Sequence, residues 1–490
     1  MVDLLSFLPA WPPGAALIGL GLICAVARGR WVGALGLAGV ALEFARLDLD
    51  GLALTGAISV LVVVGLAALA SSRDYALSES AVSPGLSLVL GGLLLMAVQL
   101  DDLGWVAVLL FLAGLVERAL VPGGDAAGRD PATGVPTARA HAWRGAVLIS
   151  LASASLIGLG AQGRMQEGGD LLVEWIGTPF AGDAPSTLIF LGLVTPLALP
   201  PNWGGAGQAI AAGPARRDAG SFVNAGLLRG LVLLVLLGRT FSGSDALLDV
   251  GLAVVLLAPV LALTGRQITA RFLALSIYGV LGLLMGVASI ASGSAQGALG
   301  LSVFGLALAG TGAALSLVLT THARGREPGL GERGLGHVFP SAFGFALLCM
   351  LALMALPGTL LFEGRSSGLE AMSSDGAASE ALLFTVMAGP LAIFAALPFL
   401  RQAFFSPGEA GGHVEGRRAT APLAMTLALA VAAGSLVALG LVPSALAALL
   451  PSGGIAPADR LLTGPQQLQV LLGAALLARI VRRERSTGPA

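Results

Sequence analysis

The sequence predicts an all-α integral membrane protein of about fourteen transmembrane helices. Of its 490 residues, 56% are hydrophobic and only 11% are charged, and the mean hydropathy is +0.88. Soluble domains are about 25% charged, so this chain has too few charges to cover a surface that faces water. Apolar runs long enough to cross a bilayer, roughly 17 residues or more, recur along the sequence.

These runs give the expected spans in chain order, each ending at a polar or helix-breaking segment. The approximate spans are 13–27, 31–45, 52–70, 84–100, 103–121, 145–162, 186–200, 222–238, 246–264, 272–291, 297–321, 338–361, 381–400 and 421–445. Residues 1–450 therefore form the predicted transmembrane domain. Residues 451–490 follow as a hinge, PSGGIAPADR, and one extra C-terminal helix with a basic end. That helix is expected to lie on a partner or the membrane interface, or to form a short fifteenth span.

The distribution of arginines predicts the orientation. Connections after odd-numbered spans hold sixteen arginines, and connections after even-numbered spans hold five. Because basic residues accumulate on the cytoplasmic side, the odd connections are expected in the cytoplasm and the N-terminus on the other side. All six tryptophans lie near the end of a span, where aromatic residues meet the membrane interface.

Composition also argues against several partners and cofactors. The net charge of -1 lacks the basic footprint of a nucleic-acid-binding protein. Cys24 and Cys349 lie in apolar runs, and the four histidines are scattered without the paired spacing of metal ligands. We therefore expect no metal, no cofactor and no redox centre in this chain.

Two segments are expected to break helices inside the membrane. They are PLALPPNWGGAGQAIAAGP, residues 196–214, and ALPGTLLFEGR, residues 355–365. The breaking residues are Pro196, Pro200, Pro201, Pro214, Pro357 and Gly358. Broken helices at membrane depth often line ion or substrate paths, because protein or water must satisfy the freed backbone groups. The alternative is an ordinary proline kink followed by a loop.

Several segments resemble subunit N of bacterial NADH–quinone oxidoreductase and its antiporter-like relatives in Mrp antiporters and membrane-bound hydrogenases. They are LDLDGLALTGAISVLVVVGLAALASSRDYA, RAHAWRGAVLISLASASLIGLGAQ, ITARFLALSIYGVLGLLMG, LMALPGTLLFEGR and GPLAIFAALPFLRQAFF. Each motif is weak alone, but they follow the family's order and spacing over about residues 15–450. The resemblance implies two inverted five-helix repeats with one broken helix each, other membrane subunits as partners, and a bacterial cytoplasmic membrane.

Conducting members of that family carry a charged chain across the membrane centre, and this sequence departs from it. The fifth-span Glu position falls on Phe111, with Glu117 six residues later, and the seventh-span Lys position falls on Thr195. The tenth-span His position falls on Val280. All 27 basic residues counted as Lys or Arg are arginine, which cannot release a proton in a relay.

Four residues remain as candidates for a proton path. Arg229 lies within about three residues of the eighth-span Lys position, and Arg365 falls on the twelfth-span position. Glu117 is either part of the path or a marker of the membrane interface beside Arg118. Glu43 is either part of the path or the ion-pair partner of Arg46. Arg229 is the strongest candidate because a charge inside the membrane is costly, although it also fits a side chain that reaches the interface.

The sequence leaves three functions open. The favoured one is a membrane-arm subunit of a complex-I-like assembly, associated with proton translocation but with a degenerate or rewired path. The second is a non-conducting scaffold subunit of such an assembly. The third is a stand-alone cation or proton transporter that uses the broken helices as its site.

Overall fold

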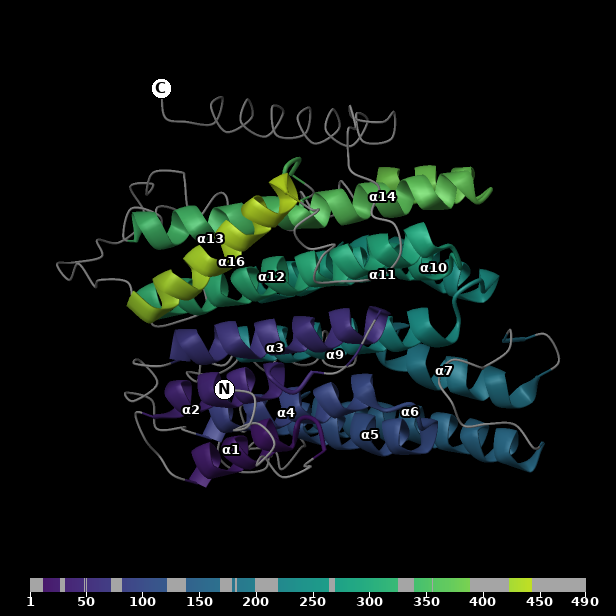
Figure 1. Cartoon of the computed structure of the whole chain (residues 1–490), viewed down its shortest axis with the longest axis horizontal. Coiled ribbons are helices and arrows are strands. Elements are labelled where there is room, and N and C mark those ends of the chain that lie inside the picture. Colours follow the sequence, from purple (N-terminus) through teal and green to yellow (C-terminus); the bar gives the residue numbers. More distant parts are fainter. Residues whose placement is uncertain are drawn as a thin grey trace. The chain divides into compact units, whose positions relative to one another are not determined.

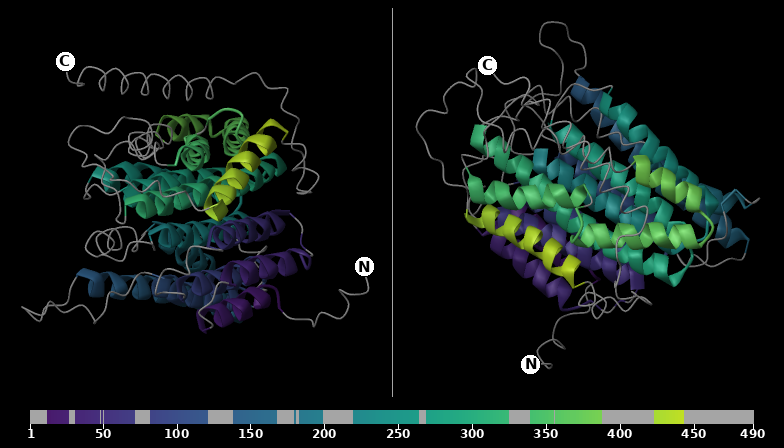
Figure 2. Two further views of the ribbon diagram at one scale, coloured as in Figure 1. Left: turned by 90° about the vertical axis from the view of Figure 1, so that its left-hand side faces the viewer. Right: turned by 90° about the horizontal axis from the view of Figure 1, so that it is seen from above.

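The computed structural model describes most of the apolar segments as helices (Figures 1 and 2). The described residues are 12–26, 31–47, 49, 51–71, 82–120, 138–167, 179–180, 183–198, 219–263, 269–324, 339–354, 356–387 and 423–442. The chain divides into two compact units. Unit 1 comprises Met1–Thr240 and Pro422–Ala428, and unit 2 comprises Phe241–Ala421 and Leu429–Ala490.

Unit 1 is built around one buried helix. Its helices are α1 (Ala15–Val26), α2 (Val32–Phe44), α3 (Gly51–Ser71), α4 (Val82–Gln99), α5 (Leu103–Leu120), α6 (Ala138–Gln166), α7 (Ala184–Ala198) and α9 (Ala219–Thr240). Helix α9 packs against α3, α4, α5 and α7. Every side chain from 225 to 238 is buried, as expected for a helix that is apolar on all sides. Any charge in that stretch must therefore find its partner inside the unit.

Glycines bring α1 and α4 into backbone contact in unit 1. A Cβ added to Gly21 would lie 2.7 Å from the carbonyl oxygen of Gly85, and one added to Gly92 would lie 2.7 Å from that of Gly14. Seven residues separate the two positions on each helix, which is about two turns. Without water to drive association, helices in membranes rely on small residues that allow such close packing.

Unit 2 is centred on α12. Its helices are α10 (Asp245–Leu263), α11 (Thr269–Ala288), α12 (Gly293–Arg324), α13 (Pro340–Leu353) and α14 (Leu360–Ser374), with a further helical segment at Ala378–Met387. Helix α16 (Leu423–Leu441) is divided between the units at Ala428. Helix α12 packs against α11, α13 and α14.

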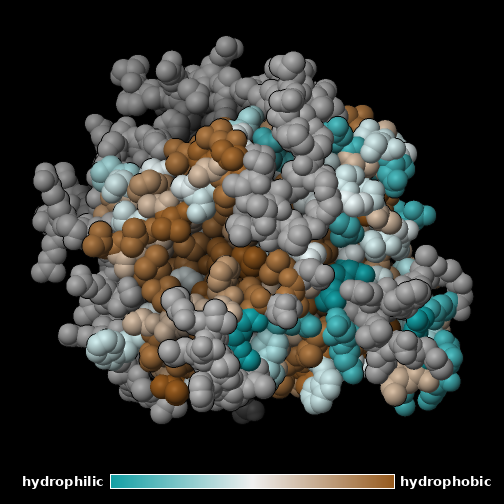
Figure 3. All heavy atoms as spheres, viewed as in Figure 1, coloured by the Kyte–Doolittle hydropathy of each residue, from teal (hydrophilic) through white to brown (hydrophobic). Residues whose placement is uncertain are grey.

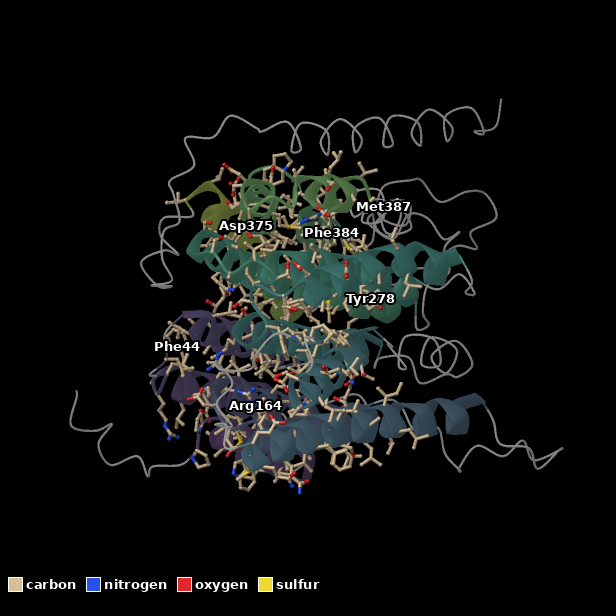
Figure 4. All side chains as sticks on the ribbon, turned by 90° about the vertical axis from the view of Figure 1, so that its right-hand side faces the viewer. Phe44, Arg164, Tyr278, Asp375, Phe384 and Met387 are labelled. Atoms are coloured by element: carbon tan, nitrogen blue, oxygen red, sulfur yellow. The ribbon has the colours of Figure 1, made fainter. Side chains whose placement is uncertain are left out.

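The core of unit 2 also contains large aromatic side chains. Tyr278 and Phe384, labelled in Figure 4, are each 1% exposed or less. The ring of Phe384 covers Gly286 of α11, where an added Cβ would lie 2.6 Å from it. An aromatic ring thus fills the space that the glycine leaves on α11.

The lengths and surfaces of the helices are those of a multi-pass membrane protein. Four helical stretches are long and apolar enough to cross a membrane: Gly51–Ser71, Val147–Gln166, Gly293–Ser316 and Leu423–Leu441. Eight shorter apolar helices accompany them among the described residues. Apolar side chains form a broad brown surface in Figure 3, including the face on which α16 is drawn. A surface of this kind is stable against lipid but not against water.

The helices fall where apolar runs predicted spans, with one clear difference. The span expected at 338–361 contains α13 and a break, and the following helix α14 was not predicted as part of any span. Its sequence, LLFEGRSSGLEAMSS, includes three charged residues and four serines, so it lacks an apolar run. The total of fourteen spans and the inverted repeats stay predictions.

Candidate functional site

The clearest polar feature in unit 1 is a buried ion pair. Nη1 of Arg229, on α9, lies 2.8 Å from Oε2 of Glu117, on α5. The side chain of Glu117 is 0% exposed and that of Arg229 is 8% exposed. The structure therefore brings two of the four predicted path residues together, and it places Glu117 inside the unit rather than on its surface.

A second ion pair shows how deep the first one lies. Arg239, at the end of α9, contacts Asp101 at 2.8 Å and donates a hydrogen bond to the carbonyl oxygen of Val98 at 2.9 Å. The Asp101 side chain is 59% exposed, so this pair belongs at the edge of the apolar layer. Ten residues of helix separate Arg229 from Arg239, or about 15 Å at 1.5 Å per residue. That distance is half of a hydrocarbon core of ~30 Å, so a helix that ran along the membrane normal would place Arg229 near mid-membrane depth.

Glu43 supports the start of a neighbouring helix. Its carboxylate oxygen Oε1 accepts a hydrogen bond of 2.9 Å from the backbone N–H of Ala16, in the first turn of α1. Glu43 is 1% exposed. First-turn N–H groups lack partners within their own helix and carry partial positive charge, so a carboxylate there stabilises the helix terminus. The observed contact is thus structural, and it joins α2 to α1.

Arg365 lies in unit 2, on the second turn of α14. It is 1% exposed, and its Nη1 donates one long hydrogen bond of 3.4 Å to the carbonyl oxygen of Leu353, the last residue of α13. The side chain therefore spans the interruption between the two helices. It lies in the other compact unit from Glu117 and Arg229, and the two sites are described separately.

The interruption between α13 and α14 contains the predicted Pro357 and Gly358. Gly358 has a φ of +81°, a left-handed conformation that residues with a Cβ rarely adopt. Thr359 Oγ1 donates a hydrogen bond of 2.7 Å to the carbonyl oxygen of Leu356, which satisfies one acceptor freed by the break. Gly440 of α16 packs directly on this segment, since a Cβ there would lie 2.5 Å from the Gly358 oxygen.

The first predicted break falls mostly outside the described residues. Pro196 lies inside α7, which continues to Ala198. Pro200, Pro201 and Pro214 are among residues 199–218, which the structure does not describe. The predicted hinge and C-terminal helix at 451–490 also lie outside the described residues.

Helix α7 and helix α14 each contact a neighbouring helix closely through glycine and serine. In unit 1, Ser153 Oγ of α6 donates a hydrogen bond of 2.6 Å to the carbonyl oxygen of Gly192 of α7. In unit 2, a Cβ on Gly364 of α14 would lie 2.5 Å from Ser302 Oγ of α12. These close crossings fix α7 against α6 in unit 1 and α14 against α12 in unit 2.

A polar cluster at the N-terminal end of α7 was not predicted. Asp183 Oδ1 accepts a hydrogen bond of 3.2 Å from the backbone N–H of Ser186, and Asp183 Oδ2 accepts a hydrogen bond from the Ser186 hydroxyl. Arg164, labelled in Figure 4, lies 3.4 Å from Asp183 Oδ2. Burial raises the pKa of the Asp183 carboxyl, but the Ser186 hydrogen bonds and Arg164 outweigh it and hold that pKa below its ordinary value. The capping signal, an Asp three residues before a Ser, was visible in the sequence.

The chemistry of the Glu117–Arg229 site is limited by the arginine. A guanidinium keeps its proton in proteins, so Arg229 supplies a fixed positive charge. The carboxylate of Glu117 compensates that charge in a region closed to water. No group of three or more potential metal ligands occurs in the residues that the structure describes.

Comparison with solved structures relates the whole arrangement to known membrane complexes. No family model and no curated protein matches the sequence. A chain in the structure of the Mrp complex from Dietzia sp. DQ12-45-1b matches with a TM-score of 0.67 and 14% identity, covering 89% of this chain and 94% of that one. The chain has the fold of an antiporter-like membrane subunit.

Two structures of respiratory complex I from Thermus thermophilus give the same result. The one with bound NADH contains a chain with a TM-score of 0.66 and 18% identity, covering 89% of this chain and 96% of that one. The one with bound aureothin contains a chain with a TM-score of 0.65 and 19% identity, covering 89% and 100%. The shared fold extends over nearly the full length of each neighbour. The predicted resemblance to membrane subunits of these complexes is confirmed, whereas the fourteen spans and the inverted repeats stay predictions.

Proposed function

We propose that the chain is a membrane-arm subunit of a multi-subunit complex related to complex I or Mrp, with a rewired or lost proton path. The observation that carries this proposal is the ion pair of Glu117 and Arg229, 2.8 Å apart and buried inside unit 1. The site has a carboxylate and a cation on the two helices that carry charged residues in the conducting relatives, although at displaced positions. Its cation, however, is a guanidinium that does not exchange protons.

The surroundings of the pair support a fixed rather than a mobile charge. Arg229 is held on a helix whose side chains from 225 to 238 are all buried, and Glu117 is fully enclosed on α5. Moving a proton through the pair would leave a charge without compensation in a low-dielectric interior. Protons that cross this subunit would therefore have to use other groups.

The decisive experiment measures proton movement in reconstituted vesicles that contain the intact complex. We expect R229M and E117Q complexes that stay assembled to retain the wild-type rate, because the pair does not carry protons. Loss of proton movement in an assembled E117Q complex would instead make the subunit a working channel. D101N is the matched control, since it removes a carboxylate from the exposed pair in the same unit.

A non-conducting scaffold is the alternative inside the same type of complex. The scaffold function predicts that no proton movement passes through this subunit, either in the wild-type complex or in the variants. A stand-alone transporter is the third possibility, and co-purification tests it. Transport by the isolated chain in liposomes, with no other subunit present, would contradict both complex-bound functions.

The membrane and the orientation belong to the same proposal. We place the protein in a bacterial cytoplasmic membrane with its N-terminus on the non-cytoplasmic side, from the distribution of arginines. Trp31, which precedes α2 and is 74% exposed, then lies on the cytoplasmic side. A W31C variant should react with an impermeant thiol reagent in inverted vesicles and not in intact cells. Cys24 and Cys349 are buried and give a low background.

The C-terminal region offers a test for partners. Residues 451–490 carry a hinge and an apolar segment with a basic end, which we propose to be a docking element for another subunit. Truncation after residue 450 should then leave the chain in the membrane but reduce the amount of partner subunit that co-purifies with it. Unchanged co-purification would contradict this role.

A further inference from the structure

Arg365 is buried in unit 2 with most of its hydrogen-bonding capacity unused. The residue is 1% exposed, and its only hydrogen bond to a described residue is the 3.4 Å contact with the Leu353 carbonyl oxygen. Its Nε and Nη2 atoms are buried and have no hydrogen-bond partner among the residues that the structure describes. Buried polar groups in native proteins almost always have partners, and a buried cation needs a compensating charge.

The described carboxylates do not supply that charge. At 100° per residue, the helix positions that share a face with Arg365 are Leu361, Phe362, Gly368 and Leu369. Glu363 lies about 200° around α14 from Arg365, and Glu370 lies about 140° around it. No described carboxylate lies within 4.0 Å of the guanidinium, in contrast to Arg164, Arg229 and Arg239.

The segment around Arg365 is polar, and it joins the C-terminus of α13, which carries partial negative charge, to the N-terminus of α14, which carries partial positive charge. Ser366, the next residue on α14, and Ser302, which packs on Gly364, are buried with hydroxyl groups that also lack partners. Arg365 reaches back to the end of α13, so its guanidinium lies beside the interruption that precedes the N-terminus of α14. A helix N-terminus adds partial positive charge and unpaired N–H groups to such a site.

We infer that the Arg365 guanidinium binds a small inorganic anion of the halide class inside unit 2. A water molecule would accept hydrogen bonds from Nε and Nη2 but would leave the positive charge uncompensated. A halide provides both a hydrogen-bond acceptor for Nε and Nη2 and a compensating negative charge. This anion holds α14 to the end of α13, and it is independent of the ion pair on which the proposed function rests.

The test is the effect of halide on the thermal stability of the purified protein. Chloride replaces gluconate at constant ionic strength, and the melting temperature is measured in one detergent. We expect the melting temperature to rise with chloride and with bromide, because a ligand at a hundred times its Kd shifts the folding equilibrium roughly a hundredfold. R365M should lose this dependence, and R164Q should keep it, since Arg164 already has a carboxylate partner.

A second measurement covers the case in which R365M does not fold. Wild-type protein prepared in bromide should give an anomalous scattering peak within hydrogen-bond distance of Arg365 Nε or Nη2. A stability that is independent of halide, a halide effect that survives in R365M, or a water in place of the bromide peak would each overturn the inference.

Discussion

Glu117 of α5 and Arg229 of α9 form an ion pair in the interior of unit 1, with 2.8 Å between Oε2 and Nη1. Sixteen residues before Glu117, Asp101 forms the corresponding contact with Arg239 at the end of the same helix α9. One pair is enclosed and the other reaches the surface. Helix α9 is thus fixed by charge at its centre and at one end, and the two pairs give a matched set for mutation.

Breaking the enclosed pair should destabilise the protein far more than breaking the exposed one. Removing one partner of a buried pair costs about 3–5 kcal/mol, because the other charge stays buried without compensation. Exposed pairs contribute about 0–1 kcal/mol. We therefore expect E117Q and R229M to lower the melting temperature strongly and D101N to change it little, in thermal unfolding of the purified protein.

The double variant E117L/R229M separates charge from packing. Replacing both partners of a buried pair by apolar residues of similar volume is often neutral or stabilising. The double variant should therefore be more stable than either single variant. A double variant as unstable as the sum of the two single variants would mean that the two side chains do not act as a pair.

Gly21 should tolerate no larger residue, whereas Gly19 on the same helix should. A Cβ on Gly21 would lie 2.7 Å from the Gly85 oxygen and 2.9 Å from the Val89 backbone nitrogen, while a Cβ on Gly19 meets nothing within 4 Å. Overpacking of this kind costs about 1–3 kcal/mol. In thermal unfolding, G21A should be less stable than wild type and G19A at least as stable. Equal loss in both would show that α1 and α4 do not cross at Gly21.

Gly440 and Gly434 provide the same comparison on α16. A Cβ on Gly440 would lie 2.5 Å from the oxygen of Gly358, in the segment before α14, and 2.6 Å from the nitrogen of Leu360, the first residue of α14. Nothing lies within 4 Å of a Cβ on Gly434. G440A should therefore increase hydrogen exchange of the first-turn amides of α14, and G434A should not. Unchanged exchange in G440A would contradict the close packing at the break.

Lowering the pH should weaken the start of α7. The pKa of Asp183 lies below its ordinary value in the folded protein, so the folded state binds fewer protons there than the unfolded state. Its contribution to stability is present above the ordinary carboxyl pKa and is lost as the pH falls through the lowered value. The protection of the α7 amides, relative to their intrinsic exchange rate at each pH, should fall over that acidic range.

The variant D183N serves as the control for that measurement. Asparagine can still accept a hydrogen bond from the Ser186 N–H, but it does not titrate. Exchange in the first turn of α7 should then be higher than in wild type at neutral pH and should change less on acidification. The same acid response in D183N and wild type would assign the effect to another group.

Much of the fold was accessible from the sequence. The apolar runs located the membrane helices, because a helix needs about 20 consecutive apolar residues to cross a bilayer. Few other structures require so long an apolar run. The order of the motifs indicated the antiporter-like fold, which the comparisons then confirmed. Pro357 and Gly358 marked the interruption before α14, since a proline lacks the N–H and a glycine permits the positive φ found at position 358.

Helix α14 could not be found in this way. Glu363, Arg365 and Glu370 interrupt its hydropathy, and the helix depends on contacts with α12 and α16 that hydropathy does not encode. Sequence spacing likewise could not pair Glu117 with Arg229, which are 112 positions apart and belong to helices that meet only after folding.

The sequence by itself determined that this protein lies in a membrane, that its basic residues cannot release protons, and where most of its apolar helices lie along the chain. These are properties of local composition and of single side chains. Only the tertiary structure decided what each charge does. It paired Glu117 with Arg229, turned Glu43 toward the first turn of α1, and left Arg365 buried beside an interrupted helix. The physical reason is that the cost of a buried charge depends on the partner that folding brings to it.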